Sequence, residues 1–206
     1  MRLSLFAAAI VMAASLLVLN YALKEIWTSS RFTNVVSIAN DIDTYGSVPN
    51  ETLLASMDTL SAIADENVCR SDIVRAGMSL VLKDLDYRYQ SEDVTSRSNG
   101  LIFAERYLRH ALKCLPVDGN VWLRFAMVRY ARTSNVDELA QLISMSQQLA
   151  PSDENVIFGR FTLWNSAPAQ LQQDAATAYT ADKDAVCSRK WNLVRKKIPD
   201  LCPKTS

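Results

Sequence analysis

The sequence contains few residues that interrupt helices and few that carry out catalysis. Among its 206 residues are five glycines, six prolines and one histidine. Most stretches also lack the alternation of apolar and polar residues that a half-buried strand requires, and apolar residues recur instead at three- and four-residue spacing. The sequence therefore predicts an all-α protein. Because 49% of the residues are hydrophobic and the formal net charge is zero, the chain can bury a core of ordinary size.

The residues that catalysis and metal binding need are scarce. The histidine, His110, has Glu105 as its only nearby carboxylate in sequence, whereas a catalytic base needs a positioned partner, so we expect a solvated or partly packed side chain. The sequence contains no glycine-rich phosphate loop, no His-Glu-x-x-His and no Cys-x-x-Cys. Four dispersed cysteines and one histidine also argue against a zinc site. We therefore expect no enzyme activity, no catalytic residue, no metal and no cofactor.

A long uncharged segment stands near the start of the sequence. Residues 3–23 contain no charged side chain and, as a helix, are long enough to cross about 30 Å of hydrocarbon. A cleaved signal peptide is one interpretation, but its apolar region usually has about 7–15 residues and ends at a small-x-small site, which is missing here. A transmembrane signal anchor over residues 1–23 is therefore favoured. The flanking charges, Arg2 on one side and Lys24 and Arg31 on the other, leave its orientation open.

All four cysteines follow this segment, at Cys69, Cys114, Cys187 and Cys202. An even number in an exported domain suggests disulfides, so we expect the body outside the cytoplasm, in the periplasm of a Gram-negative bacterium. The competing interpretation is four reduced, buried cysteines in a cytosolic domain. A Cys187–Cys202 bond would close the last segment and contribute about 3 kcal/mol in the chain-entropy model, which leaves Cys69–Cys114 as the complementary pair. Other pairings remain open.

Helices are expected on both sides of a break at residues 45–49. Residues 24–49 form a juxtamembrane helix that ends in the run Tyr-Gly-Ser-Val-Pro. Asn50 is expected to cap the next helix, and another helix begins at about Ser71. The serine- and asparagine-rich run over residues 90–100 has the composition of a loop.

One short pattern occurs twice. PVDGNVW begins at Pro116 and PSDENVI begins at Pro151, 35 positions later. Proline ends one helix, aspartate two residues later accepts bonds from the free N–H groups that begin the next helix, and an apolar residue four positions on starts a buried face. A fixed period of this size is typical of helical repeats. A third near-copy at residues 65–68 lacks the proline and is taken as chance or as a degenerate repeat.

The helix before the first copy resembles the second helix of a tetratricopeptide repeat. The residues that match the family spacing are Ala104, Leu108, Ala111, Leu112 and Pro116, followed by Asp118 at the cap and Trp122, Phe125 and Ala126 at the next core positions. The family pattern departs at Arg129, where an aromatic is preferred, and at Ser146-Gln147. The resemblance is clearest over residues 101–164. It implies an α-solenoid of antiparallel helix pairs over residues 50–182, preceded by the anchor and followed by a tail over residues 183–206.

The resemblance also implies a surface for a partner. In this family the first helix of each pair lines a concave groove that holds a partner peptide. The positions carried over are Asn120, Leu123, Met127, Tyr130, Asn155, Phe158 and Thr162. The helix over residues 120–132 is apolar nearly all round, so it is either buried on two sides or exposes such a groove.

The last segment is basic. Its charged cluster consists of Arg189, Lys190, Arg195, Lys196 and Lys197. These side chains form either an ordinary solvated helix face or a surface for an anionic glycan, lipid or acidic protein.

Together these features favour a single-pass protein of the inner membrane with its C-terminal domain in the periplasm. We expect it to bind a protein partner as a scaffold subunit of an envelope complex, such as one for polysaccharide synthesis or export. This setting is a fold-level analogy. The alternative is a glycan- or anionic-lipid-binding module that uses the basic cluster, and no nucleic-acid partner is expected.

Overall fold

The computed structural model describes residues 2–188 and 201–202, with side chains from Ile10 onward. This part of the chain is helical and contains no strand, as predicted. Its helices are α1 (Arg2–Tyr45), α2 (Asn50–Asp65), α3 (Ser71–Gln90), α4 (Val94–Cys114), α5 (Gly119–Thr133), α6 (Val136–Leu149), α7 (Glu154–Ser166), α8 (Gln170–Asp174) and α9 (Ala176–Cys187).

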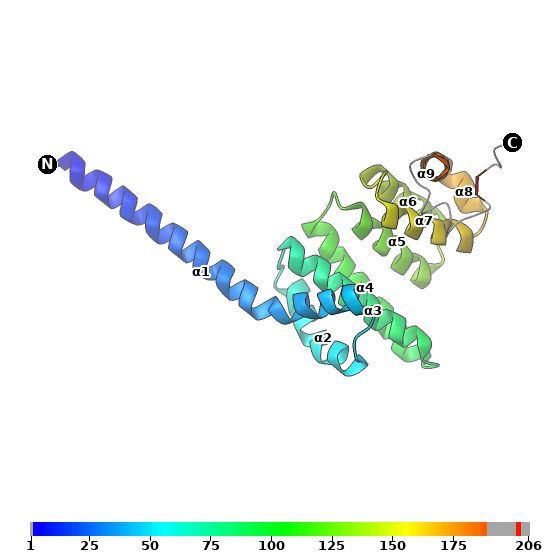
Figure 1. Cartoon of the computed structure of the whole chain (residues 1–206), viewed down its shortest axis with the longest axis horizontal. Helices are drawn as coiled ribbons and strands as arrows, with labels where there is room; N and C mark the ends of the chain where they lie inside the picture. The colour runs from blue at the N-terminus through cyan, green and yellow to red at the C-terminus, as the bar shows by residue number, and fades with distance from the viewer. Residues whose placement is uncertain (1, 189–200, 203–206) are drawn as a thin grey trace.

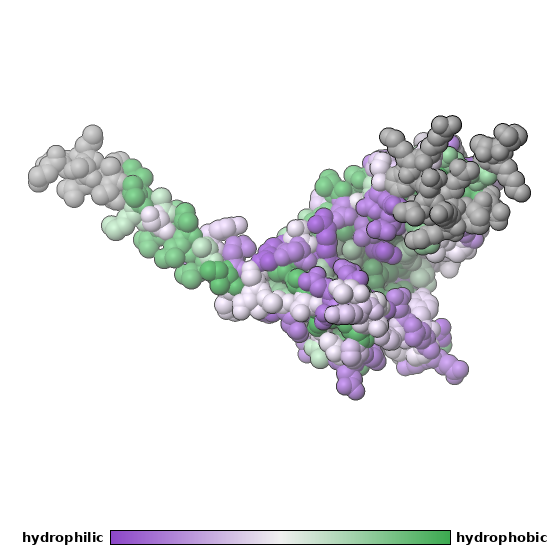
Figure 2. Space-filling model, in the orientation of Figure 1, coloured by the Kyte–Doolittle hydropathy of each residue, from purple (hydrophilic) through white to green (hydrophobic). Residues whose placement is uncertain are grey.

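Helix α1 projects from the body as a rod of 44 residues (Figure 1). From residue 10 onward, apolar residues cover most of its projecting part, whereas polar residues cover much of the visible face of the body (Figure 2). Among the described helices, only α1 is long enough and apolar enough to cross a membrane. The predicted anchor and juxtamembrane helix are therefore one continuous helix. It ends where Gly46, with φ of +73°, donates its N–H to the Ile42 carbonyl at 2.8 Å.

The second half of α1 belongs to the core of the body. Phe32, Val35, Ile38 and Ala39 are at most 5% exposed and pack in one cluster with side chains of α2, α3, α4 and α5. A second cluster joins α5, α6, α7, α8 and α9. Helix α5 contributes to both clusters, because Val121 and Phe125 face one and Leu123 and Ala126 face the other. Burial on two sides explains why this helix is apolar nearly all round.

The repeated Pro-x-Asp pattern marks two helix starts, as predicted. The Asp118 carboxylate accepts the N–H groups of Asn120 and Val121 at 3.0 and 3.4 Å and caps α5. Asp153 accepts those of the corresponding residues of α7 at 3.0 and 3.1 Å. The third near-copy begins at Asp65, the last residue of α2, so it marks a helix end and matches the pattern by chance.

Two sequence expectations about helix starts are wrong. Residues 90–100 are mostly helix, because α4 begins at Val94 and the Asp93 carboxylate accepts the N–H groups of Thr95 and Ser96 at 2.9 and 3.1 Å. The polar run is thus the capped first part of a helix. Asn50 is the first residue of α2, and no side-chain bond caps that helix.

Helices α7 and α9 are joined by a fully buried ion pair. Arg160 donates through Nε and Nη2 to the two carboxylate oxygens of Asp182 at 2.7 and 2.6 Å, and both side chains are 0% exposed. Trp164 donates its indole N–H to the same carboxylate at 3.1 Å. Arg160 also donates to the hydroxyl and carbonyl oxygens of Ser146. Helix α9 continues to Cys187, so the helical body extends past the boundary expected at residue 182.

Candidate protein-binding cleft

A cleft of about 710 Å³ lies where α1, α3, α5 and α7 present side chains to one side of the body. Five residues predicted for the partner groove line it: Asn120, Met127, Asn155, Phe158 and Thr162. We call this hollow the central cleft.

Two of the predicted groove residues lie elsewhere. Leu123 is 0% exposed and packs in the second core cluster, and Tyr130 is half-buried against the same cluster. Leu123 is directed at Gly159 of α7, where a Cβ atom on residue 159 would stand 2.7 Å from a Leu123 methyl carbon. Glycine therefore lets α5 and α7 approach closely, and Leu123 fills the space between them. Assigning Leu123 to the groove was wrong, because a helix that is apolar all round does not reveal which stripe faces outward.

The contribution of α1 and α3 was not predicted from the sequence. Asp43 of α1 and Arg75, Met78 and Ser79 of α3 line the central cleft together with the predicted residues. No repeat signal pointed to them, since α3 and α4 have 20 and 21 residues and lack the Pro-x-Asp start of α5 and α7. The helical spacing of apolar residues in α3 predicted a helix of the body. It did not indicate that this helix lies beside the groove.

A smaller hollow of about 260 Å³ adjoins the central cleft between α3, α4 and α5. Its apolar walls are Leu82, Leu85, Leu101, Val128 and Ala131. Asp86, Tyr89, Arg124 and Met127 complete its lining. Arg124 and Met127 line both hollows, so the two lie next to each other along one turn of α5. We call the smaller hollow the side pocket.

The charged groups of the central cleft differ in how they are paired. Arg75 bonds to the Asp118 carboxylate at 2.9 Å, and Asp153 is occupied as the cap of α7. Arg124 instead contacts the Met127 sulfur, at 3.8 Å. Burial lowers the pKa of the Arg124 guanidinium, and the charge of Asp86 opposes this effect. A mixed apolar and polar lining of this kind suits a peptide better than a highly charged ligand.

The cysteines lie in two pairs at disulfide distance, Cys69 with Cys114 and Cys187 with Cys202. These are the two pairs considered first from the sequence, where other pairings remained open. The first bond ties the connection between α2 and α3 to the end of α4, and the second ties the end of α9 to residues 201–202.

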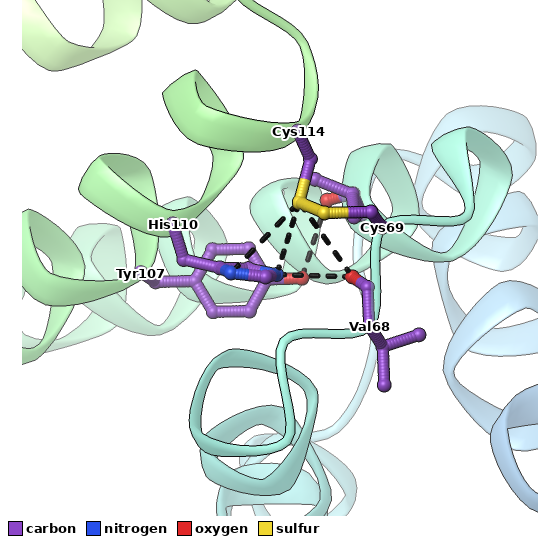
Figure 3. The surroundings of a disulfide bond; sticks show 6 residues. Val68, Cys69, Tyr107, His110 and Cys114 are labelled. Atoms are coloured by element: carbon purple, nitrogen blue, oxygen red, sulfur yellow. Dashed lines mark hydrogen bonds between the residues drawn. A yellow bond between two sulfur atoms is a disulfide. The ribbon is translucent and has the colours of Figure 1, made fainter.

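His110 lies beside the first disulfide and is more buried than expected, with 5% of its surface exposed (Figure 3). Its Nε2 is 3.0 Å from the Val68 carbonyl oxygen, which can only accept, so this nitrogen donates. The Cys114 sulfur lies 3.6 Å from the same nitrogen, and the Tyr107 ring stands edge-on to the imidazole. The histidine therefore holds the connection before α3 in place next to the disulfide.

The five basic residues of the predicted cluster, Arg189, Lys190, Arg195, Lys196 and Lys197, lie outside the described residues. Within the described ranges, no three histidine, cysteine, aspartate or glutamate side chains are grouped to hold a metal ion.

Comparison with protein-family models, curated proteins and solved structures found no match to this chain.

Proposed function

We propose that this protein is a membrane-anchored scaffold whose extracytoplasmic body binds a protein partner in the central cleft. The observation that carries this proposal is the cleft itself, formed by the first helices of successive helix pairs, α3, α5 and α7. This is the arrangement expected of a solenoid similar to tetratricopeptide repeats. Binding of an extended or helical peptide along such a groove is a common mode of protein recognition.

The projecting apolar half of α1 supports a membrane anchor, and the disulfides support an oxidising compartment outside the cytoplasm. The proposed location is the inner membrane, with the body in the periplasm. An anchor confines the body to the membrane plane and raises its effective concentration near a membrane partner. A subunit that assists polysaccharide synthesis or export is the setting we propose by fold-level analogy.

Photo-crosslinking in native membranes tests the proposal. A photoreactive phenylalanine analogue is placed at Asn155 or Thr162, both exposed in the central cleft, and at Gln141, exposed on α6, as the control position. The proposal predicts one discrete protein adduct from the two cleft positions and none from Gln141. A Ser79→Trp substitution, which fills the cleft from α3, should remove the adduct. Equal adducts from all three positions, or an adduct unaffected by filling the cleft, would contradict it.

A second candidate function is suggested by the charge of the C-terminal segment. Its five clustered basic residues would attract an anionic glycan or lipid headgroup. Retention of the full chain on immobilised heparin, as a model acidic polysaccharide, should then fall steeply with salt. Replacement of Arg189, Lys190, Arg195, Lys196 and Lys197 by glutamine should abolish retention. If the substituted chain is retained equally, the basic cluster does not bind the polysaccharide.

A further inference from the structure

The side pocket has the size and lining of a site for one large side chain. Its volume of about 260 Å³ falls below the roughly 300–1,000 Å³ of typical small-molecule sites. Two of its walls, Leu85 and Val128, are at most 8% exposed and belong to the core, so the floor of the pocket is fixed by packing. An apolar pocket that adjoins a groove can take up one anchoring side chain of a partner, and such anchors carry a large share of an interface's binding energy.

Arg124 stands at the junction of the side pocket and the central cleft without a carboxylate partner. It is half-buried, and among the described residues no carboxylate oxygen lies within 4.0 Å of its guanidinium. Arg97 of α4 is likewise half-buried with no carboxylate of the described residues within 4.0 Å, and its buried Nε has no hydrogen-bond partner among them. Unlike Arg124, it lines neither hollow. Other half-buried arginines have a carboxylate partner. Arg88 pairs with Asp84 at 2.7 Å, and Arg129 pairs with Glu138 at 2.8 Å.

The contacts of Arg124 within the protein are weak ones. The thioether sulfur of Met127 is a poor acceptor, and the exposed Asp86 acts on Arg124 only at longer range. A guanidinium that has lost part of its water and gained no carboxylate favours an incoming anion, which it can bind through two parallel N–H bonds.

We propose that the side pocket and Arg124 recognise a two-residue feature of the partner protein, a large apolar side chain close to a carboxylate. The apolar side chain enters the side pocket, and the carboxylate pairs with Arg124 at its rim. This inference rests on the proposed function, because it names what the partner presents to the groove. The small size of the side pocket argues against a small metabolite as the ligand. Arg124, which has no carboxylate partner among the described residues, argues against a basic peptide.

Fluorescence anisotropy with defined peptides tests this inference on the full chain in detergent micelles. The probes are fluorescein-labelled nine-residue peptides of glycine and serine that carry a central tryptophan and a glutamate one, two or three residues later. Matched peptides replace the glutamate by lysine or the tryptophan by alanine. We expect at least one glutamate spacing to bind about tenfold more tightly than its lysine counterpart, and the alanine peptides to lose binding.

Three variants assign the effect to the pocket. Arg124→Gln should remove the preference for glutamate, whereas Arg124→Lys, which keeps the charge but not the two-bond geometry, should retain part of it. Ala131→Trp fills the side pocket from its exposed wall and should abolish binding of the tryptophan peptides. Lys113→Gln removes a positive charge from an exposed position of α4 that lines neither hollow, and it should change nothing.

The outcomes separate this inference from the proposed function. If no peptide binds, or if glutamate and lysine peptides bind equally, the inference is overturned. The adduct formed from Asn155 reports on the central cleft independently. An adduct that persists unchanged in the Arg124→Gln and Ala131→Trp chains would leave the scaffold function intact and reject the side pocket as its recognition site.

Discussion

Among the described residues, each buried carboxylate is paired with at least one arginine. Asp84 accepts from Arg88, and Asp182 is bonded to Arg160. Glu105 of α4 is 5% exposed and lies among arginines of α4 and α5. A buried ion pair adds little net stability compared with an apolar pair, but removal of one partner leaves an unpaired charge. These residues therefore make the packing of the helices sensitive to single substitutions.

Removal of the Asp182 carboxylate should strongly destabilise the protein. Asp182→Ala leaves the guanidinium of Arg160 buried without its counter-charge, which costs about 3–5 kcal/mol. The unfolding free energy can be followed by the fluorescence of Trp164, which contacts Asp182 directly. Asp72→Ala removes a half-exposed carboxylate paired with Arg70 and should cost only about 0–1 kcal/mol. Equal losses in the two variants would show that Asp182 is not structurally important.

Glu105 should make the stability depend on acid pH. Burial favours its neutral form, but hydrogen bonds from Arg109 and Arg132 and the charge of Arg129 outweigh this, and the pKa of Glu105 lies below its ordinary value of 4.5. A carboxyl group whose pKa is lowered by folding stabilises the protein above its ordinary pKa, and this contribution is lost as the pH falls below 4.5. The unfolding free energy of the wild type should therefore decrease below pH 4.5, with a shallower decrease in Glu105→Gln. Identical slopes would contradict this assignment.

At the scale of helices, what could be predicted depended on local signals at their ends. The starts of α5 and α7 were predicted correctly, because proline and a capping aspartate act within a few residues of each other. The start of α4 was missed, because serine, threonine and asparagine are common both in loops and in the first turns of capped helices. Composition alone could not separate these two cases, and only the capping bonds to Asp93 do so.

The candidate cleft was predicted in part for a similar reason. Residues of α5 and α7 were placed by the repeated spacing, whereas Arg75 and Met78 of α3 depend on long-range packing that the spacing does not encode. Leu123 was misplaced because α5 is buried on two sides. Arg124, which joins the two hollows, had no sequence signal, since its importance comes from the absence of a nearby carboxylate among the described residues in three dimensions.

The cap of α7 offers a direct test of the repeated pattern. Asp153→Ala leaves the N–H groups of Asn155 and Val156 without their acceptor and should cost about 0.5–2 kcal/mol of unfolding free energy. Asp153→Asn keeps a side-chain oxygen in the same place and should be close to the wild type. Chemical denaturation of the full chain in micelles provides the measurement. A loss as large for asparagine as for alanine would assign the effect to charge and not to capping.

At the scale of the whole molecule, α1 connects the apolar rod to the core without a linker. The projecting end of α1 and helix α9 lie at opposite ends of the molecule (Figure 1). Phe32 and Val35 are buried by other helices, and Arg31 bonds to Glu66, so α1 is fixed to the body. A membrane that holds the projecting half of α1 would therefore hold the body in one orientation. The central cleft would then face a fixed direction relative to the membrane.

Truncation tests this role of α1. A chain that begins at residue 24 keeps all the buried residues of α1 and should unfold cooperatively. A chain that begins at residue 46 loses Phe32, Val35 and Ile38 from the core, at about 1.5–3 kcal/mol each, which is comparable to the entire stability of a small domain. Circular dichroism during heating should show a cooperative transition only for the longer chain. A cooperative transition of similar midpoint in both would mean that α1 is merely attached to the body.

The proposed function depends above all on an intact anchor joined to a body folded in an oxidising compartment. The measurement that tests both at once is the mass of the whole protein extracted from membranes, with thiol alkylation before and after reduction. We predict a chain that begins at Met1 and takes up no alkyl group until reduction, after which Cys69, Cys114, Cys187 and Cys202 are all modified. A mass that begins near residue 24 would contradict the anchor, and four cysteines alkylated without reductant would contradict export.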